Sequence, residues 1–149
     1  MSPGASWKIS PVDDPLQAVR HADIVVSSMP PGDVQPVTGE ALAPGALFIP
    51  LDIVNSWQDS VLPAIDRVAA DNPANFAAQV QGKRASAFSG LKQAFRTQDA
   101  VAGRAARATG SERTLIAVCG IASTDVVVGW EIYRRACAAN IGLEFDMLG

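Results

Sequence analysis

Four short apolar runs, separated by polar and turn-forming segments, dominate the pattern of the chain. These runs are rich in β-branched residues and do not alternate between apolar and polar positions, which is typical of strands buried on both faces of a sheet. We therefore expect four buried parallel strands. They cover residues 24–29, 46–51, 67–71 and 114–119.

Helical segments are expected between these strands. Asp14 can cap a helix that Pro15 begins, and Leu16, Val19 and Ala22 recur at helical spacing. Further helices are predicted at 60–65 and 73–81, and 37–42 is expected to be a short helix or a turn. Residues 82–113 contain four glycines and predict a loop-rich segment.

The last predicted helix follows the fourth strand directly. Thr124 or Asp125 is expected to cap it, the helix is expected to run to about Ala139, and Asn140 or Gly142 is expected to end it. The alternation of strands and helices predicts an α/β fold: a partial, Rossmann-like, doubly wound parallel sheet with a C-terminal helix, in one domain over 1–149.

Ligands of such sheets bind outside the carboxyl ends of the strands. Asp52 follows the second run, and a partly desolvated carboxylate there can exchange protons with a substrate. The alternative is a turn cap over Asn55 and Ser56. Ser27 and Ser28 end the first run and offer hydroxyls to a cofactor, or they only cap the turn. Both readings stay open for each of these positions.

The glycine pattern is the strongest negative signal. A dinucleotide-binding fold normally begins with a strand, a G-x-G-x-x-G loop and a helix, which together hold the pyrophosphate. No two glycines in this sequence are two residues apart. The sequence therefore predicts a truncated dinucleotide-binding domain that is incomplete as an enzyme by itself.

Charge and composition narrow the remaining classes. A net charge of −3 gives no case for nucleic acid or an anionic membrane as partner. Seven basic residues against two acidic ones over 83–113 predict a solvated helical surface. Two cysteines and one histidine provide no metal site, and both cysteines are expected to be buried and unpaired. No apolar run reaches membrane-spanning length, and a cytoplasmic location is expected.

Three stretches resemble the ornithine cyclodeaminase/mu-crystallin family. They are the strand 22–28, the segment 43–52 and the ending 114–148, in which Gly120, Ala122, Asp125, Gly142 and Asp146 fall on the family pattern. The resemblance covers most of the chain except about 82–113, and the last stretch is the most specific.

The resemblance implies a protein that uses NAD or NADP and transfers a hydride to or from an amino acid or cyclic imino acid. Members cyclise ornithine to proline, reduce cyclic imino acids, make opine-like compounds or serve as crystallins. Asp52 matches the family's acid/base near the substrate amine, and Cys119 also falls at the substrate. The implied cofactor-lining residues are Ser28, Met29, Ile49, Pro50, Leu51 and Val118.

The chain also departs from the family. Ser56 stands where the family has a lysine, Val118 replaces a serine, and Pro50 and Leu51 replace glycines. The family's substrate-binding and dimerising N-terminal half has no counterpart in this sequence.

Three hypotheses follow from these observations. The first is a fragment of an oxidoreductase or ammonia-lyase of this family. The second is a non-catalytic remnant or binding module that folds alone or pairs with a separately encoded N-terminal half. Exposed apolar surface where that half should pack is expected to cause self-association into a homo-oligomer or aggregation. The third is an unrelated α/β ligand-binding protein whose similarity is only architectural.

Overall fold

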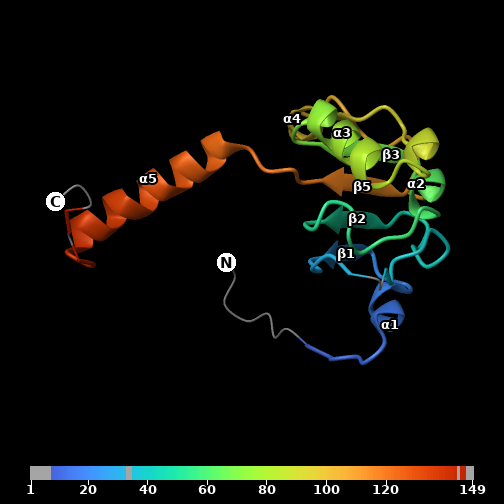
Figure 1. Cartoon of the computed structure of the whole chain (residues 1–149), viewed down its shortest axis with the longest axis horizontal. Coiled ribbons are helices and arrows are strands. Elements are labelled where there is room, and N and C mark those ends of the chain that lie inside the picture. The colour runs from blue at the N-terminus through green and yellow to red at the C-terminus, as the bar shows by residue number, and fades with distance from the viewer. Residues whose placement is uncertain (1–7, 33–34, 144, 147–149) are drawn as a thin grey trace. The chain divides into compact units, whose positions relative to one another are not determined.

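The computed structural model describes residues 8–32, 35–143 and 145–146, and it divides the chain into two units. Residues 1–119 form the first unit and residues 120–149 the second (Figure 1). Each unit is described by itself below.

The first unit is built on a parallel sheet. Its five strands lie in the order β1-β2-β5-β3-β4, and every neighbouring pair is parallel. The expected α/β fold and the four expected strands are confirmed. The fifth strand, β4, was missed because two residues give no readable pattern. The strands are β1 (Ile24–Ser27), β2 (Leu47–Pro50), β3 (Arg67–Ala70), β4 (Phe95–Arg96) and β5 (Thr114–Ala117).

The helices of this unit are short apart from α3. The helices α1 and α3 begin at Pro15 and Pro73, as the sequence predicts, whereas η1 and α4 lie in the segment expected to be loop-rich. Asp14 caps α1 by accepting a hydrogen bond from Leu16 N at 2.9 Å, and Asn72 caps α3 in the same way from Asn75 N at 3.0 Å. Residues 39–41 form a turn rather than a helix, and Val37 makes an isolated parallel bridge with Trp57. The helices are α1 (Pro15–Val19), α2 (Val61–Ala64), α3 (Pro73–Lys83), the 3-10 turn η1 (Phe88–Gly90) and α4 (Thr97–Val101).

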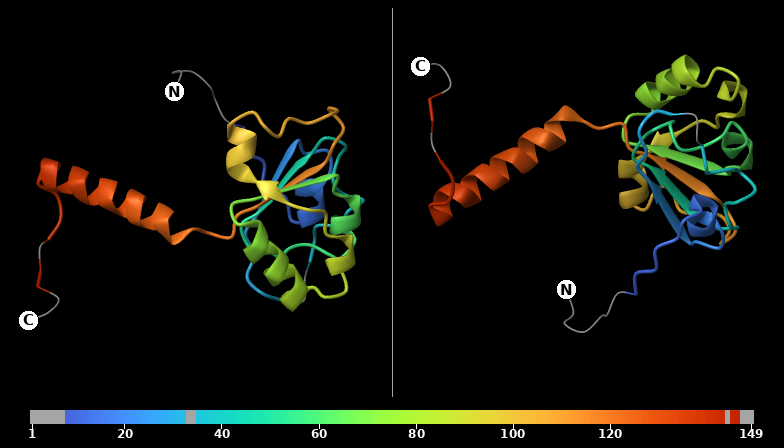
Figure 2. Two further views of the ribbon diagram at one scale, coloured as in Figure 1. Left: turned by 90° about the horizontal axis from the view of Figure 1, so that it is seen from above. Right: turned by 60° about the horizontal axis from the view of Figure 1, so that its bottom comes forward.

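The hydrophobic core lies on one face of this sheet. Val25, Phe48, Leu115 and Val68 are in register across β1, β2, β5 and β3, and all four are buried. Residues of α2 and α3 belong to the same core cluster, as does Trp57, which is fully buried. Figure 2 shows α3 and α4 on opposite sides of the sheet, so the winding is double.

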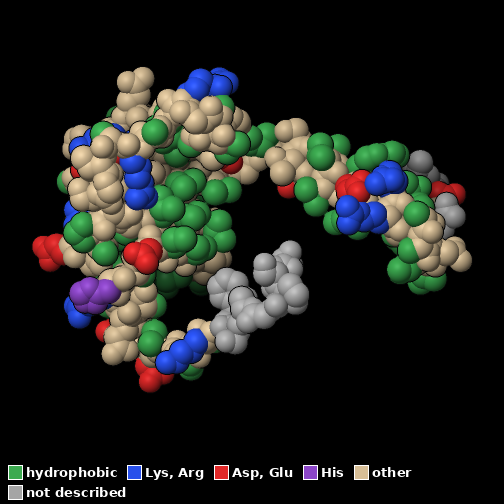
Figure 3. All heavy atoms as spheres, turned by 180° about the vertical axis from the view of Figure 1, so that it is seen from behind, with side chains coloured by type: hydrophobic (Ala, Val, Ile, Leu, Met, Phe, Trp, Pro, Cys, Tyr) green, Lys and Arg blue, Asp and Glu red, His purple; other side chains and the backbone are tan. Residues whose placement is uncertain are grey.

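The other face of the sheet is apolar but only partly covered at β1. Ile24 and Val26 are each 58% exposed, and Leu47 and Ile49 continue their face on β2. Figure 3 shows hydrophobic side chains gathered over this unit. Exposed β-branched residues on this face are unusual, because doubly wound sheets are normally covered on both faces.

The outer edge of β1 is also open among the described residues. Leu47 N donates to Asp23 O and Leu51 N donates to Ser27 O, both at 2.9 Å. Alternate residues of a parallel strand direct their backbone groups to the same side. The N–H and C=O groups of Ile24 and Val26 therefore point away from β2, where the described chain has no further strand.

The second unit contains the helix α5 (Ala122–Ala139). Asn140 ends it in the left-handed conformation, with φ of 54°, as expected. The expected cap at Thr124 or Asp125 is wrong: the N-cap is Ile121, and no side chain caps the helix. The starting turn begins earlier because Ala122 is a good helix former.

No residue of α5 is buried. Its exposed large hydrophobic side chains are Val126, Val127, Val128, Trp130, Ile132 and Tyr133. Cys137 is exposed and Cys119 half-buried, and both are unpaired, so the expectation that both thiols are buried is wrong. Within the described residues, no helix is both long and apolar enough to traverse a lipid bilayer.

Candidate functional site

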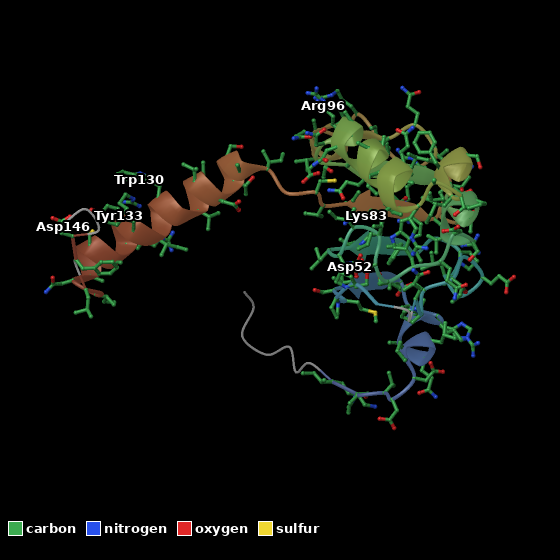
Figure 4. All side chains as sticks on the ribbon, viewed as in Figure 1. Asp52, Lys83, Arg96, Trp130, Tyr133 and Asp146 are labelled. Carbon is green, nitrogen blue, oxygen red and sulfur yellow. The ribbon has the colours of Figure 1, made fainter. Side chains whose placement is uncertain are left out.

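The carboxyl ends of neighbouring parallel strands meet at one edge of the sheet, and the candidate site lies there. The residues that follow β1 and β2 form one cluster around Asp52, which Figure 4 labels at this edge. The residues that follow β5 and β3 form a second cluster around Asp71. Because β2 and β5 are neighbours in the sheet, the two clusters occupy a single edge.

Asp52 ties the ends of β1 and β2 together. One carboxylate oxygen, Oδ2, accepts a hydrogen bond from Met29 N at 3.0 Å. The other, Oδ1, accepts from Ser56 Oγ at 3.1 Å and from Ser56 N at 3.4 Å. Asn55 Nδ2 adds a hydrogen bond to Met29 O at 3.3 Å. The capping interaction over Ser56 is thus present, and the same carboxylate also remains partly exposed at the strand ends.

A short chain of hydroxyl groups leads from Ser27 to this carboxylate. Ser56 is fully buried, and its Oγ lies 2.7 Å from Ser27 Oγ. Ser56 Oγ lies within hydrogen-bond distance of both Ser27 Oγ and Asp52 Oδ1, and its single hydroxyl proton is donated to one of these two oxygens at a time. The groups that hold Asp52 here are neutral.

The backbone next to Asp52 is strained. Ile53 has φ of 62°, a left-handed conformation that a β-branched residue rarely adopts. It costs on the order of 1–2 kcal/mol. Trp57 Nε1 donates to Ile53 O at 2.8 Å and helps to hold this conformation. Strain of this kind persists only where the surrounding contacts fix the backbone, and it is concentrated at functional sites.

Arg84, just after α3, fastens the loop that carries Asp52. Its guanidinium donates to Val54 O at 3.0 and 3.2 Å, to Trp57 O, to Asp59 at 3.1 Å and to Gln35 Oε1 at 3.0 Å. It also lies over the Trp57 ring, 5.0 Å from the centroid. Its side chain is only 11% exposed, so the expected solvated surface over 83–113 is wrong at this position.

Asp71 ties the ends of β3 and β5. Its Oδ1 accepts hydrogen bonds from Cys119 N at 3.0 Å and from Asn72 N at 2.7 Å. Burial, the charge of Asp71 and a hydrogen bond to Asp71 together raise the pKa of the Cys119 thiol to about 11. Cys119 is therefore a neutral thiol at physiological pH and a poor nucleophile.

The residues predicted to line a cofactor divide into exposed and buried side chains. Leu51 and Val118, which follow β2 and β5, are 51% and 40% exposed, and Ser28 is also exposed. Met29 and Ile49 are half-buried. Pro50 is fully buried, and its carbonyl accepts a hydrogen bond from Ile53 N at 3.3 Å.

Sequence reasoning missed Asp71, Arg84 and the hydroxyl of Ser56. Asp71 ends the predicted strand 67–71, and its position before Asn72 and Pro73 gave no hint of a bond to Cys119. Arg84 lies in a basic stretch without periodicity. Only Ser56 carried a signal, because a polar residue four positions after a strand-end aspartate can reach back to it.

The arrangement fits one end of a nicotinamide cofactor. Leu51 and Val118 follow the neighbouring strands β2 and β5 and are exposed, and the partly exposed Asp52 follows Leu51 at the same strand ends. Apolar side chains and a carboxylate at one place suit an uncharged ring next to a proton-transfer group. The described residues offer no glycine-rich turn at a helix N-terminus for the phosphates. The nicotinamide end of the group fits this edge, and the phosphate end needs donors from elsewhere.

The solved structures that resemble the chain include the following three. A probable ornithine cyclodeaminase from Bordetella pertussis Tohama I aligns with 22% identity and a TM-score of 0.66, over 88% of this chain and 44% of that one. The Delta(1)-pyrroline-2-carboxylate reductase of Thermococcus litoralis, solved with NADH and L-proline, aligns with 16% identity and a TM-score of 0.67, over 90% and 44%. The protein CmnK aligns with 17% identity and a TM-score of 0.67, over 93% and 42%.

No protein-family model and no curated protein matches the sequence. The chain spans less than half the length of each of the three structures it resembles. At these identities the likeness concerns the fold. The chain has the Rossmann-like α/β fold that makes up under half of a probable ornithine cyclodeaminase and of a proline-binding, NADH-binding reductase.

Proposed function

We propose that this chain is the second half of the NAD(P)-binding domain of an ornithine cyclodeaminase-like protein. The protein would act on an amino acid or a cyclic imino acid. The observation that carries the proposal is the edge formed by Leu51, Asp52 and Val118, in a fold shared with a reductase that was solved with NADH and L-proline. The cytoplasm, with its reducing conditions, suits the two unpaired thiols.

In this proposal each residue at the edge has a physical task. Leu51 and Val118 would bind the nicotinamide ring and exclude water from one side of it. Asp52 would take or return a proton at a carboxylate oxygen, which the bonds from Met29 and Ser56 hold in one orientation. When bound, NAD(P) would supply the site that accepts or donates the hydride.

The proposal also includes a requirement for more polypeptide. The open outer edge of β1 and the exposed side chains of Ile24 and Val26 suit a further parallel strand with a helix above it. That addition would carry the glycine-rich turn for the phosphates. It would come from the same polypeptide or from a separately encoded one.

A titration with two half-cofactors tests the nicotinamide assignment on the chain itself. Reduced nicotinamide mononucleotide and adenosine monophosphate carry the same ribose phosphate and differ in the base. In two-dimensional NMR spectra at millimolar ligand, we expect the nicotinamide compound to shift the amides of Leu51, Asp52, Val118 and Cys119, and the adenosine compound to leave them unchanged. Equal shifts, or none at these amides, would contradict the assignment.

A non-catalytic binding module is the second candidate, and the specific observation in its favour is Ser56. The resembling family has a lysine ammonium group beside the aspartate, and this chain has the hydroxyl group of Ser56 there. Asp52 therefore has no positively charged neighbour at that position to assist proton transfer. The test uses this chain assembled with the polypeptide that carries the glycine-rich turn. If Asp52 is the acid/base, Asp52→Asn abolishes turnover and leaves NADH binding intact. If the module only binds, the assembly binds NADH with and without this substitution and shows no turnover in either case.

A further inference from the structure

Two aspartates at the carboxyl edge of the sheet make the same kind of contact. Asp52 follows β2 and accepts a hydrogen bond from Met29 N, two residues after the end of the neighbouring strand β1. Asp71 follows β3 and accepts one from Cys119 N, two residues after the end of the neighbouring strand β5. In both cases a carboxylate holds the backbone at the point where the adjacent strand leaves the sheet.

The bond from Asp71 acts just beyond the point where β5 stops pairing with β3. Parallel pairing of β3 with β5 ends at Ala70 and Ala117, and Asp71 N adds one bond to Ala117 O at 3.3 Å. Beyond that point Val118 is exposed and Gly120 has φ of 84°. Beyond Ala117, Cys119 contacts Asp71, the residue that follows β3, through its backbone N–H and its thiol.

We propose that Asp71 is a positioning residue that fixes the backbone of Val118 and Cys119 at the cofactor edge. The role rests on the proposed function, because a fixed Val118 matters only if a ligand packs on it. Asp71 acts through two bonds to Cys119, one to the amide and one to the thiol. It does not touch the reacting atoms itself.

The thiol makes this contact measurable without any cofactor. Alkylation by iodoacetamide proceeds through the thiolate, so its rate at a fixed pH reports the pKa of the thiol. Burial is the largest cause of the raised pKa of Cys119, followed by the charge of Asp71 and then its hydrogen bond. Replacing Asp71 removes the second and third causes and leaves the first.

The experiment uses the full chain with Cys137→Ser, which leaves Cys119 as the only thiol. Asp71→Asn removes the charge and keeps an oxygen that can accept from the amide. At pH 8.5 we expect it to alkylate about three- to tenfold faster than the parent, since one pKa unit corresponds to a tenfold change. Hydrogen exchange of the Cys119 amide should stay slow. Asp71→Ala should speed up both alkylation and amide exchange.

Asp66→Ala is the matched control. Asp66 precedes β3 and accepts a hydrogen bond from Arg113 N, just before β5, at 2.8 Å. It therefore makes the equivalent contact at the opposite edge of the sheet, and its replacement should leave Cys119 alkylation unchanged. If Asp66→Ala and the Asp71 variants accelerate alkylation equally, general loosening explains the effect and the proposal is wrong.

The outcomes separate this inference from the proposed function. An unchanged alkylation rate in Asp71→Asn, with native circular dichroism, would overturn the role of Asp71 whatever the chain binds. If Asp71→Ala fails to fold, Asp71→Asn alone decides. A failed half-cofactor titration with the expected Cys119 behaviour would instead refute the nicotinamide site and leave Asp71 as a support of the β5 end.

Discussion

Replacing Arg84 by alanine should destabilise the chain much more than replacing the exposed Arg104 by alanine. Arg84→Ala leaves the carbonyls of Val54 and Trp57 without their guanidinium donor and removes the partner of Asp59. A buried group that loses its partner costs about 1–3 kcal/mol. Asp59 is 43% exposed, so water replaces part of its lost pairing.

The expected loss in the free energy of unfolding is therefore about 3–5 kcal/mol. Arg104→Ala is the control, because Arg104 makes an ion pair with Asp99 at 2.6 Å but is 64% exposed. Its replacement should cost about 0–1 kcal/mol. Urea unfolding followed by circular dichroism gives both values. If the two variants differ by less than about 1 kcal/mol, Arg84 does not fasten the loop of Asp52 as the contacts indicate.

Two further predictions concern the thiol and the open edge. Between pH 9 and about 11 the unfolded chain has lost the Cys119 proton while the folded chain keeps it, so the free energy of unfolding falls as pH rises. In urea unfolding at a series of pH values, Cys119→Ala should make this fall less steep. An equal dependence of the unfolding free energy on pH in both proteins would count against the raised pKa. The wild-type chain should self-associate through β1, where Ile24 and Val26 are exposed. The double variant Ile24→Lys, Val26→Lys should lower the molecular mass found by light scattering. A monomeric wild-type chain would show that β1 does not cause self-association.

Continuous apolar runs made the sheet readable from sequence. A run such as 114–119 is apolar at successive positions, so both faces of its strand must be buried, which predicts a parallel strand inside a covered sheet. The cap at Asp14 and the helix end at Asn140 followed from local chemistry. The two-residue strand β4 was not readable, because Phe95 and Arg96 carry no period and pair only through the tertiary fold.

The candidate site was predictable only in part. Asp52 could be named because it follows a strand, but its bond to Met29 joins residues 23 positions apart, and no local pattern encodes that distance. Asp71 and Cys119 are 48 positions apart, and Arg84 and Val54 are 30 apart. The left-handed Ile53 runs against the preference of its residue type, so sequence reasoning points away from it. These contacts follow from strand order rather than from residue spacing.

The central claim is that this sheet carries the nicotinamide end of a cofactor site without the turn that holds the phosphates. Calorimetric titration of NADH into the purified chain tests it most directly. We expect no measurable binding at micromolar concentrations, because the described residues offer the pyrophosphate no glycine-rich turn. A saturable binding curve with a dissociation constant in the micromolar range would show that the chain binds the whole cofactor, phosphates included, and would contradict the account.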